Sequence, residues 1–133
     1  MSQTPRVLLV DDSTPDLVLH QIAFEEAGYP VELESYQRAA EALRDIETGT
    51  LKPDLILLDI NMPGMDGWEF AEAYDQLQES QRTGTIVMML TTSLNPNDRE
   101  RAERCGVIER FFNKPLTAEM IETMLRTHGF LDD

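Results

Sequence analysis

The sequence predicts an α/β fold in which five strands of a doubly wound parallel sheet alternate with five helices. The first observation is a set of short apolar runs that end in polar residues, as expected for strands buried on both faces. These runs cover residues 8–10, 55–58, 87–90 and 111–112. The second observation is that a glycine follows each helix-like stretch between and after the runs, where a left-handed cap is common: Gly28, Gly49, Gly84, Gly106 and Gly129. This alternation implies right-handed crossovers.

The first strand leads into a helix that opens with Ser13 or Thr14 as its N-cap and Pro15 in its first turn. We expect the side chain of His20 to lie on the surface of this helix, because the two histidines of the chain show no ligand spacing. The spacing of apolar residues predicts a buried stripe formed by Leu19, Ile22, Ala23 and Ala27.

The second strand lies near residues 31–35 and precedes a helix whose inward side chains are Ala39, Ala42, Leu43 and Ile46. After the third strand, a helix begins near Asp66 and carries Phe70, Tyr74 and Leu77. The last helix is capped by Thr117 and faces the sheet with Ile121, Met124 and Leu125. Each of these helices has an apolar side that the sheet can cover.

The fourth helix has a different pattern. Asn95 can cap it and Pro96 can occupy its first turn, but Ala102 is the only apolar residue between residues 97 and 104. A helix that buries so little area gains little from tertiary packing. We therefore expect it to be the most mobile element of the fold.

The 133 residues suit a single domain, and we expect residues 1–133 to form it without an output domain. The net charge of −14 makes nucleic acid and membrane surfaces poor partners, since both are anionic. Cys105 is the only cysteine, which excludes an intrachain disulfide and favours a reducing, cytoplasmic location. No apolar run approaches the roughly 18 residues that a membrane-spanning helix needs.

Polar residues stand where four of the apolar runs end: Asp11 and Asp12, Asp59, Thr91, and Lys114. In a parallel sheet the carboxyl ends of the strands share one edge, where such folds bind their ligands. Carboxylates about 4 Å apart repel by roughly 4 kcal/mol at an effective dielectric near 20, unless a cation lies between them. Magnesium, with its oxygen ligands, suits such a site when phosphate is the substrate. Alternatively, each aspartate is a turn or cap residue and the lysine is a solvated surface residue.

Asp59 is the best candidate for a reacting group, because it stands alone at the end of a central strand. A carboxylate can attack phosphorus and form an acyl phosphate. Phosphoryl transfer mainly requires positioning and charge neutralisation, which Lys114 and the hydroxyl of Thr91 can provide at the phosphoryl oxygens. The bond between Lys114 and Pro115 is a candidate for the cis form that X-Pro bonds allow.

Four segments resemble the receiver domain of two-component response regulators, in that family's order and at its approximate spacing. They are VLLVDDS at residues 7–13, PDLILLDINMPGMDG at 53–67, MLTTS at 89–93 and FFNKPLT at 111–117. The resemblance spans nearly the whole chain and implies a CheY-like, flavodoxin-like fold with strand order 2-1-3-4-5. It also implies a stand-alone response regulator that acts in a phosphorelay.

By this resemblance, Asp59 accepts a phosphoryl group from a sensor histidine kinase or a phosphotransfer protein. Mg²⁺ is held by the carboxylates of Asp12 and Asp59, by the backbone carbonyl of Asn61, and by Asp11 through a water molecule. Thr91 and Lys114 hold the phosphoryl oxygens. The protein is then not an enzyme, although it takes part in phosphotransfer and dephosphorylates itself.

The resemblance further implies a switch formed by Thr91 and Phe111. Its output surface is the face of the fourth helix, fifth strand and fifth helix, which binds a separate, unidentified protein. Phe111 stands where many relatives have tyrosine, and it could equally be a plain core aromatic together with Phe112. Thr92 stands where a smaller residue is commoner and could restrict access to the phosphoryl group.

Two other functions compete with this one. A phosphatase resembling the haloacid dehalogenase type would need an aspartate two residues after the nucleophile, where Asn61 stands and cannot transfer the proton. A degenerate adaptor that works without phosphorylation predicts the loss of at least one site residue. None is lost, which favours the phosphorylation-dependent module over both alternatives.

Overall fold

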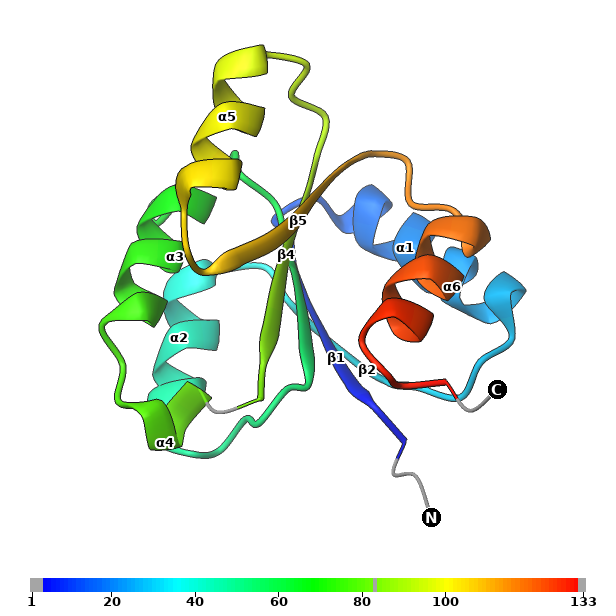
Figure 1. Ribbon diagram of the computed structural model, residues 1–133, viewed down its shortest axis with the longest axis horizontal. Coiled ribbons are helices and arrows are strands. Elements are labelled where there is room, and N and C mark those ends of the chain that lie inside the picture. The colour runs from blue at the N-terminus through cyan, green and yellow to red at the C-terminus, as the bar shows by residue number, and fades with distance from the viewer. Residues whose placement is uncertain (1–3, 83, 132–133) are drawn as a thin grey trace.

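The computed structural model describes residues 4–82 and 84–131, and their strands form one parallel sheet in the order β2-β1-β3-β4-β5 (Figure 1). This is the predicted flavodoxin-like order, with the central strands where the longest apolar runs of the sequence lie. The strands are β1 (Arg6–Val10), β2 (Glu32–Tyr36), β3 (Leu55–Leu58), β4 (Ile86–Thr91) and β5 (Ile108–Asn113).

Helices cover both faces of the sheet (Figure 1). On one face lie α1 (Thr14–Ala27) and α6 (Ala118–Thr127), and on the other lie α2 (Ala39–Glu47), α3 (Gly67–Asp75) and α5 (Pro96–Arg104). A short helix that was not predicted, α4 (Glu79–Arg82), follows α3. The predicted fourth and fifth helices are therefore α5 and α6.

The core consists of two apolar layers, one on each side of the sheet. Successive residues of β1 alternate between them, so that Leu8 and Val10 face one layer while Val7 and Leu9 face the other. Phe70 of α3 fills the first layer. The second layer is closed by buried side chains of α1 and α6: Leu17, Ala23, Phe24, Ile121, Met124 and Leu125. This burial on both faces explains why the strands read as continuous apolar runs.

The predicted buried stripe of α1 is wrong in part. Leu19 and Ile22 are 55% and 43% exposed, and the buried residues are Leu17, His20, Ala23 and Phe24. The prediction that His20 lies on the surface is also wrong, because this side chain is buried and within hydrogen-bond distance of Asp11. The polar partner allows the helix to turn a histidine inward and two aliphatic side chains outward.

The remaining helix signals are mostly confirmed. Ser13 caps α1 by accepting the backbone N–H of Asp16, and Asp66 forms a capping box with Glu69 at the start of α3. The helix α5 buries only Ala102, as expected. Gly106 differs from the other four predicted helix-end glycines, because its φ is not positive.

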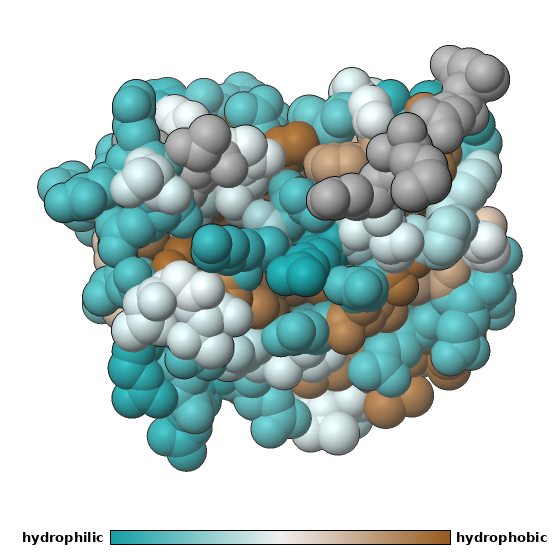
Figure 2. Space-filling model, turned by 90° about the horizontal axis from the view of Figure 1, so that it is seen from below, coloured by the Kyte–Doolittle hydropathy of each residue, from teal (hydrophilic) through white to brown (hydrophobic). Residues whose placement is uncertain are grey.

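No helix among the described residues is both long enough and apolar enough to cross a membrane. Figure 2 shows the end of the molecule that carries the amino ends of the strands. Hydrophilic residues cover most of this surface, and hydrophobic colour is visible in smaller areas between them. The polar strand-end residues singled out in the sequence lie at the opposite, carboxyl end of the strands.

Gly67 lets the loop after β3 fold back on the end of that strand. Its N–H donates to the carbonyl of Ile60 at 2.8 Å, and a Cβ at this position would lie 2.4 Å from the carbonyl oxygen of Asp59. We predict that Gly67→Ala lowers the free energy of unfolding by about 1–3 kcal/mol, because rigid backbone must shift. Urea unfolding measures this, with Gly106→Ala as the control, since a Cβ there meets nothing within 4 Å. Equal losses in both variants would contradict the prediction.

Candidate functional site

Three aspartates meet at the carboxyl edge of the sheet. Asp11, Asp12 and Asp59 each offer a carboxylate oxygen, and these oxygens lie within 4.8 Å of one another. The backbone fixes two of them, because the N–H of Asp59 donates to Val10 and the N–H of Asp11 donates to Tyr36, both at 3.0 Å. Asp11 and Asp59 are buried, whereas Asp12 is exposed. The site is thus held by the sheet and open on one side.

Lys114 reaches into this cluster from the end of β5. Its Nζ lies 2.7 Å from Asp11 Oδ2, 2.7 Å from Asp16 Oδ2 and 3.4 Å from Asp59 Oδ2. The side chain is only 8% exposed, and the backbone N–H donates to the carbonyl of Thr91 at 2.8 Å. The bond between Lys114 and Pro115 is cis. Lys114 is therefore an inward, triply paired lysine and not a solvated surface residue.

The surroundings push the pKa values of the two buried aspartates in opposite directions. Burial raises the pKa of Asp11, but hydrogen bonds from His20 and Lys114 outweigh this effect and leave it below 3.8. Burial also raises the pKa of Asp59, and here the nearby charge of Lys114 does not compensate, so the pKa stays above 3.8. Burial lowers the pKa of Lys114, but hydrogen bonds to Asp11 and Asp16 raise it well above its ordinary value. Of the two buried aspartates, Asp59 is therefore the one whose ionised form is less favoured.

Thr91 ends β4 fully buried, and its hydroxyl oxygen accepts the N–H of Ser93 at 3.2 Å. The next polar residues tie this loop to two other elements. The side chain of Ser93 donates to Asp98 in the first turn of α5, and the amide of Asn113 donates to the carbonyl of Ser93 at 2.7 Å. A continuous set of hydrogen bonds therefore connects Thr91 with α5 and with the end of β5.

Two further predicted residues lie outside this set of contacts among side chains. Asn61, whose backbone carbonyl is the predicted ligand, follows Asp59 by two residues in the loop after β3, and its side chain is exposed. Phe111 is half-buried on β5 against the core layer of α2 and α3, and the guanidinium of Arg99 lies 5.2 Å from its ring centroid. Phe112 packs against the layer on the opposite face of the sheet. The aspartates, Thr91 and Lys114 are thus brought together, while Phe111 contacts the core and α5.

The sequence interpretation missed Asp16 and His20. Both lie on α1, four residues apart, and contact the cluster: Asp16 pairs with Lys114, and His20 Nε2 lies 3.3 Å from Asp11 Oδ2. A possible signal was the spacing of an acidic residue and a histidine at positions i and i+4 in the helix that follows the paired aspartates. One helix face therefore supplies contacts to two site residues.

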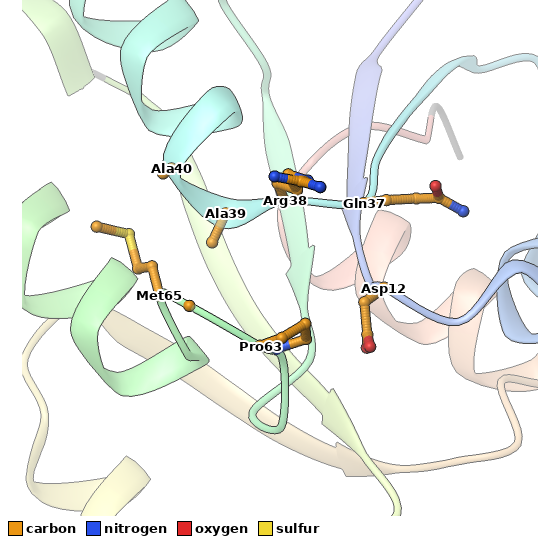
Figure 3. Close-up of a pocket in the computed structure, with 8 residues that line it drawn as sticks. Asp12, Gln37, Arg38, Ala39, Ala40, Pro63 and Met65 are labelled. Atoms are coloured by element: carbon orange, nitrogen blue, oxygen red, sulfur yellow. The ribbon is translucent and has the colours of Figure 1, made fainter.

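The donor set fits a hard divalent cation. The carboxylates of Asp11, Asp12 and Asp59 present oxygen ligands within 4.8 Å of one another, which is the ligand type that such cations prefer. A cavity of about 440 Å³ lies beside Asp12, between the end of β1, the start of α2 and the loop after β3 (Figure 3). Gln37, Arg38, Pro63 and Met65 also line it. The exposed side of the cluster is therefore accessible.

Comparison with known proteins gives one family. The family model described as "Response regulator receiver domain" matches residues 7–126. The sensor histidine kinase GacS of Pseudomonas protegens is 33% identical over 131 residues, which cover 96% of this chain and 14% of that protein. The sensor histidine kinase CheAY of Helicobacter pylori is 29% identical over 120 residues, which cover 90% of this chain and again 14% of the relative. This chain thus spans about a seventh of the length of these relatives.

Solved structures agree with the family match. A two-component response regulator from Cytophaga hutchinsonii has a TM-score of 0.85 and 27% identity, with 97% of this chain and 100% of that chain covered. The chemotaxis protein CheY4 of Vibrio cholerae has a TM-score of 0.75 and 30% identity, with 94% and 98% covered. The fold of such proteins extends over almost the whole of this chain.

We predict that Asp59→Asn stabilises the metal-free protein at neutral pH. The folded-state pKa of Asp59 is raised, so ionisation is penalised in the folded protein at every pH above that value. The penalty fades as pH falls through the folded pKa and is absent below the unfolded value of 3.8. Urea unfolding in a chelator should show a gain of about 0.5–3 kcal/mol at pH 7 that shrinks toward pH 3.5. A gain that does not depend on pH would contradict this electrostatic cause.

Proposed function

The chain belongs to the response regulator receiver domain family, and from this premise we propose that Asp59 accepts a phosphoryl group from a histidine kinase or a phosphotransfer protein. Receiver domains are signalling modules of two-component systems, and they take phosphoryl groups from histidine kinases. They typically bind Mg²⁺ at an acidic pocket. The finer assignment to this chain rests on the arrangement of its own residues.

The observation that carries the proposal is the aspartate cluster with its single inward lysine. Asp59 lies at the end of a buried central strand, with Oδ2 3.4 Å from Lys114 and with two other aspartates close by. A structural salt bridge would need one partner for the lysine, whereas here three carboxylates share it. This surplus of oxygen ligands suits a site that receives both a cation and a phosphoryl group.

In the proposed reaction a carboxylate oxygen of Asp59 forms a bond to phosphorus while the phosphorus–nitrogen bond of the donor's phosphohistidine breaks. The donor imidazole leaves as the neutral ring after taking up a proton, and Asp59 becomes an aspartyl phosphate. Lys114 Nζ is close enough to Asp59 to shift onto a phosphoryl oxygen, and the buried hydroxyl of Thr91 can donate to another. Hydrolysis of the aspartyl phosphate by water then resets the protein without a second enzyme.

The residues proposed to hold Mg²⁺ are Asp12 and Asp59 through their carboxylates, Asn61 through its backbone carbonyl and Asp11 through a water molecule. Bound Mg²⁺ would neutralise charge on the carboxylates and on the phosphoryl oxygens. Asp12 supports this role by its exposure beside the open cavity, and Asp11 by its ionised state. The backbone N–H of Ser13 donates to Oδ1 of Asp11 and helps to hold this carboxylate in place.

We place the output surface on α5, β5 and α6, which binds a separate partner protein in this proposal. Movement of Thr91 toward a phosphoryl group would pull on Ser93 and, through Asp98, on the first turn of α5. Phe111 lies next to this helix, and the guanidinium of Arg99 lies over its ring. The weak anchoring of α5, which buries only Ala102, makes it the element that can respond.

We predict that a small acyl phosphate such as acetyl phosphate adds the mass of one phosphoryl group to the intact protein, and only when Mg²⁺ is present. Asp59→Asn should abolish the gain, because the nucleophile is lost. Asp54→Asn is the matched control and should react normally, since Asp54 precedes the same strand at its opposite end. Mass spectrometry of the intact chains measures all three. No gain in wild type, or an equal gain in Asp59→Asn, would overturn the proposal.

A second prediction concerns the helix α5. Phosphorylation should change amide hydrogen exchange across residues 95–106 and leave β1 and β3 unchanged, because the apolar residues of these strands are buried while α5 is weakly held. Lys114→Ala should keep the fold and lose this response, since the ammonium group that would connect the phosphoryl group to the end of β5 is then missing. Amide hydrogen exchange of the phosphorylated and unphosphorylated proteins, measured by mass spectrometry, tests both parts. Unchanged protection at residues 95–106 would rule out this mechanism of signalling.

A further inference from the structure

His20 is a buried polar residue that neither the fold nor the proposed reaction explains. The residue is 3% exposed on the inward face of α1. Its Nε2 lies 3.3 Å from Asp11 Oδ2, whereas its Nδ1 is buried and has no hydrogen-bond partner among the described residues. The neighbouring inward residues of the helix, Leu17, Ala23 and Phe24, are all apolar. An apolar side chain at position 20 would continue this stripe.

The hydrogen bond to Asp11 has a defined direction. Oδ2 of Asp11 also pairs with Lys114 Nζ at 2.7 Å, so this carboxylate oxygen is a hydrogen-bond acceptor. The hydrogen therefore resides on Nε2, and the nitrogen without a partner is Nδ1. Because a buried polar atom without a partner destabilises the folded state, His20 contributes less to stability than an apolar residue of similar size would. Its presence calls for a reason other than stability.

The carboxylate of Asp11 receives donors on both oxygens. Oδ1 accepts the N–H of Ser13 at 2.9 Å, and Oδ2 accepts from both His20 and Lys114. These two donors on Oδ2 are held differently. His20 lies on the buried face of a helix, whereas Lys114 ends a long side chain that pairs with three carboxylates. When Lys114 moves to a phosphoryl oxygen, His20 is the side chain that still holds Oδ2.

We propose that His20 is a positioning residue for Asp11, whose hydrogen bond from Nε2 orients this carboxylate for Mg²⁺ and keeps it oriented when Lys114 leaves. The inference rests on the proposed function, because it takes the aspartate cluster as the magnesium site. Partners that hold a metal ligand from outside the metal's own shell commonly change metal affinity 10–100-fold when they are removed. The same size of effect is expected here.

The test compares His20→Leu with His20→Gln by calorimetric titration with Mg²⁺ at one pH, and by thermal unfolding of the metal-free proteins. Leucine fills the site without a donor, so the Kd for Mg²⁺ should rise about 10-fold or more, while the unfolding temperature should stay equal or rise. Glutamine places an amide N–H the same number of bonds from the backbone as Nε2, so its Kd should remain within about 3-fold of wild type. Phe24→Leu is the control on the same buried face and should change stability but not Kd.

Each outcome decides a different point. If wild type does not bind Mg²⁺, the proposed function fails, and this inference fails with it. If wild type binds and His20→Leu binds equally well, only the role of His20 is overturned. Equal losses in the leucine and glutamine variants would show that the hydrogen bond is not the cause, and a leucine variant that is clearly less stable would show that His20 serves the fold. The loss caused by His20→Leu should be larger in a Lys114→Ala background, and an equal loss would overturn the part of the proposal that concerns Lys114.

Discussion

The close approach of like charges at the carboxyl edge of the sheet is the constraint on which the rest of the site depends. Carboxylates about 4 Å apart repel by roughly 4 kcal/mol at an effective dielectric near 20. The backbone nevertheless holds Asp11 and Asp59 in place, because each donates its N–H to a neighbouring strand or loop at 3.0 Å. Lys114 supplies one positive charge and shares it among the carboxylates of Asp11, Asp16 and Asp59. The remaining imbalance is what makes the site receptive to a cation.

The fold tolerates such a cluster because the cluster lies at the ends of strands whose apolar side chains are buried. Buried side chains fill both faces of β1 and β3, and the glycine at position 67 allows the following loop to close over the end of β3. The charged groups then contribute little to stability and can be arranged for chemistry. Lys114 is positioned by β5 in the same way, through the bond from its N–H to the carbonyl of Thr91. The sheet therefore fixes the geometry of the site, and the site does not hold the sheet together.

Most of this arrangement could be predicted from the sequence, because strand ends carry their own signal. A polar residue directly after an apolar run marks the edge of a parallel sheet, and this rule located Asp11, Asp59, Thr91 and Lys114. The contributions of α1 could not be predicted with the same rule. The buried side of that helix depends on its rotation, and Leu19 and Ile22 suggested a rotation that the structure does not have. His20 faces inward toward Asp11, nine residues earlier in the chain, and a polar contact of this kind leaves no apolar pattern in the sequence.

In the proposed mechanism a change at the site acts on α5 and not on the strands, and the relative sizes of the interactions favour this. Altering the charge near Asp59 changes interaction energies on the scale of a few kcal/mol. The contacts that hold α5 are smaller, since only Ala102 is buried and the stacking of Arg99 on Phe111 and of Arg101 on Trp68 contributes about 0.5–1 kcal/mol each at exposed positions. Moving a strand would instead disrupt a ladder and two apolar layers. The helix α5 therefore needs the least free energy to move, and it is also the element that Ser93 and Asp98 connect to Thr91.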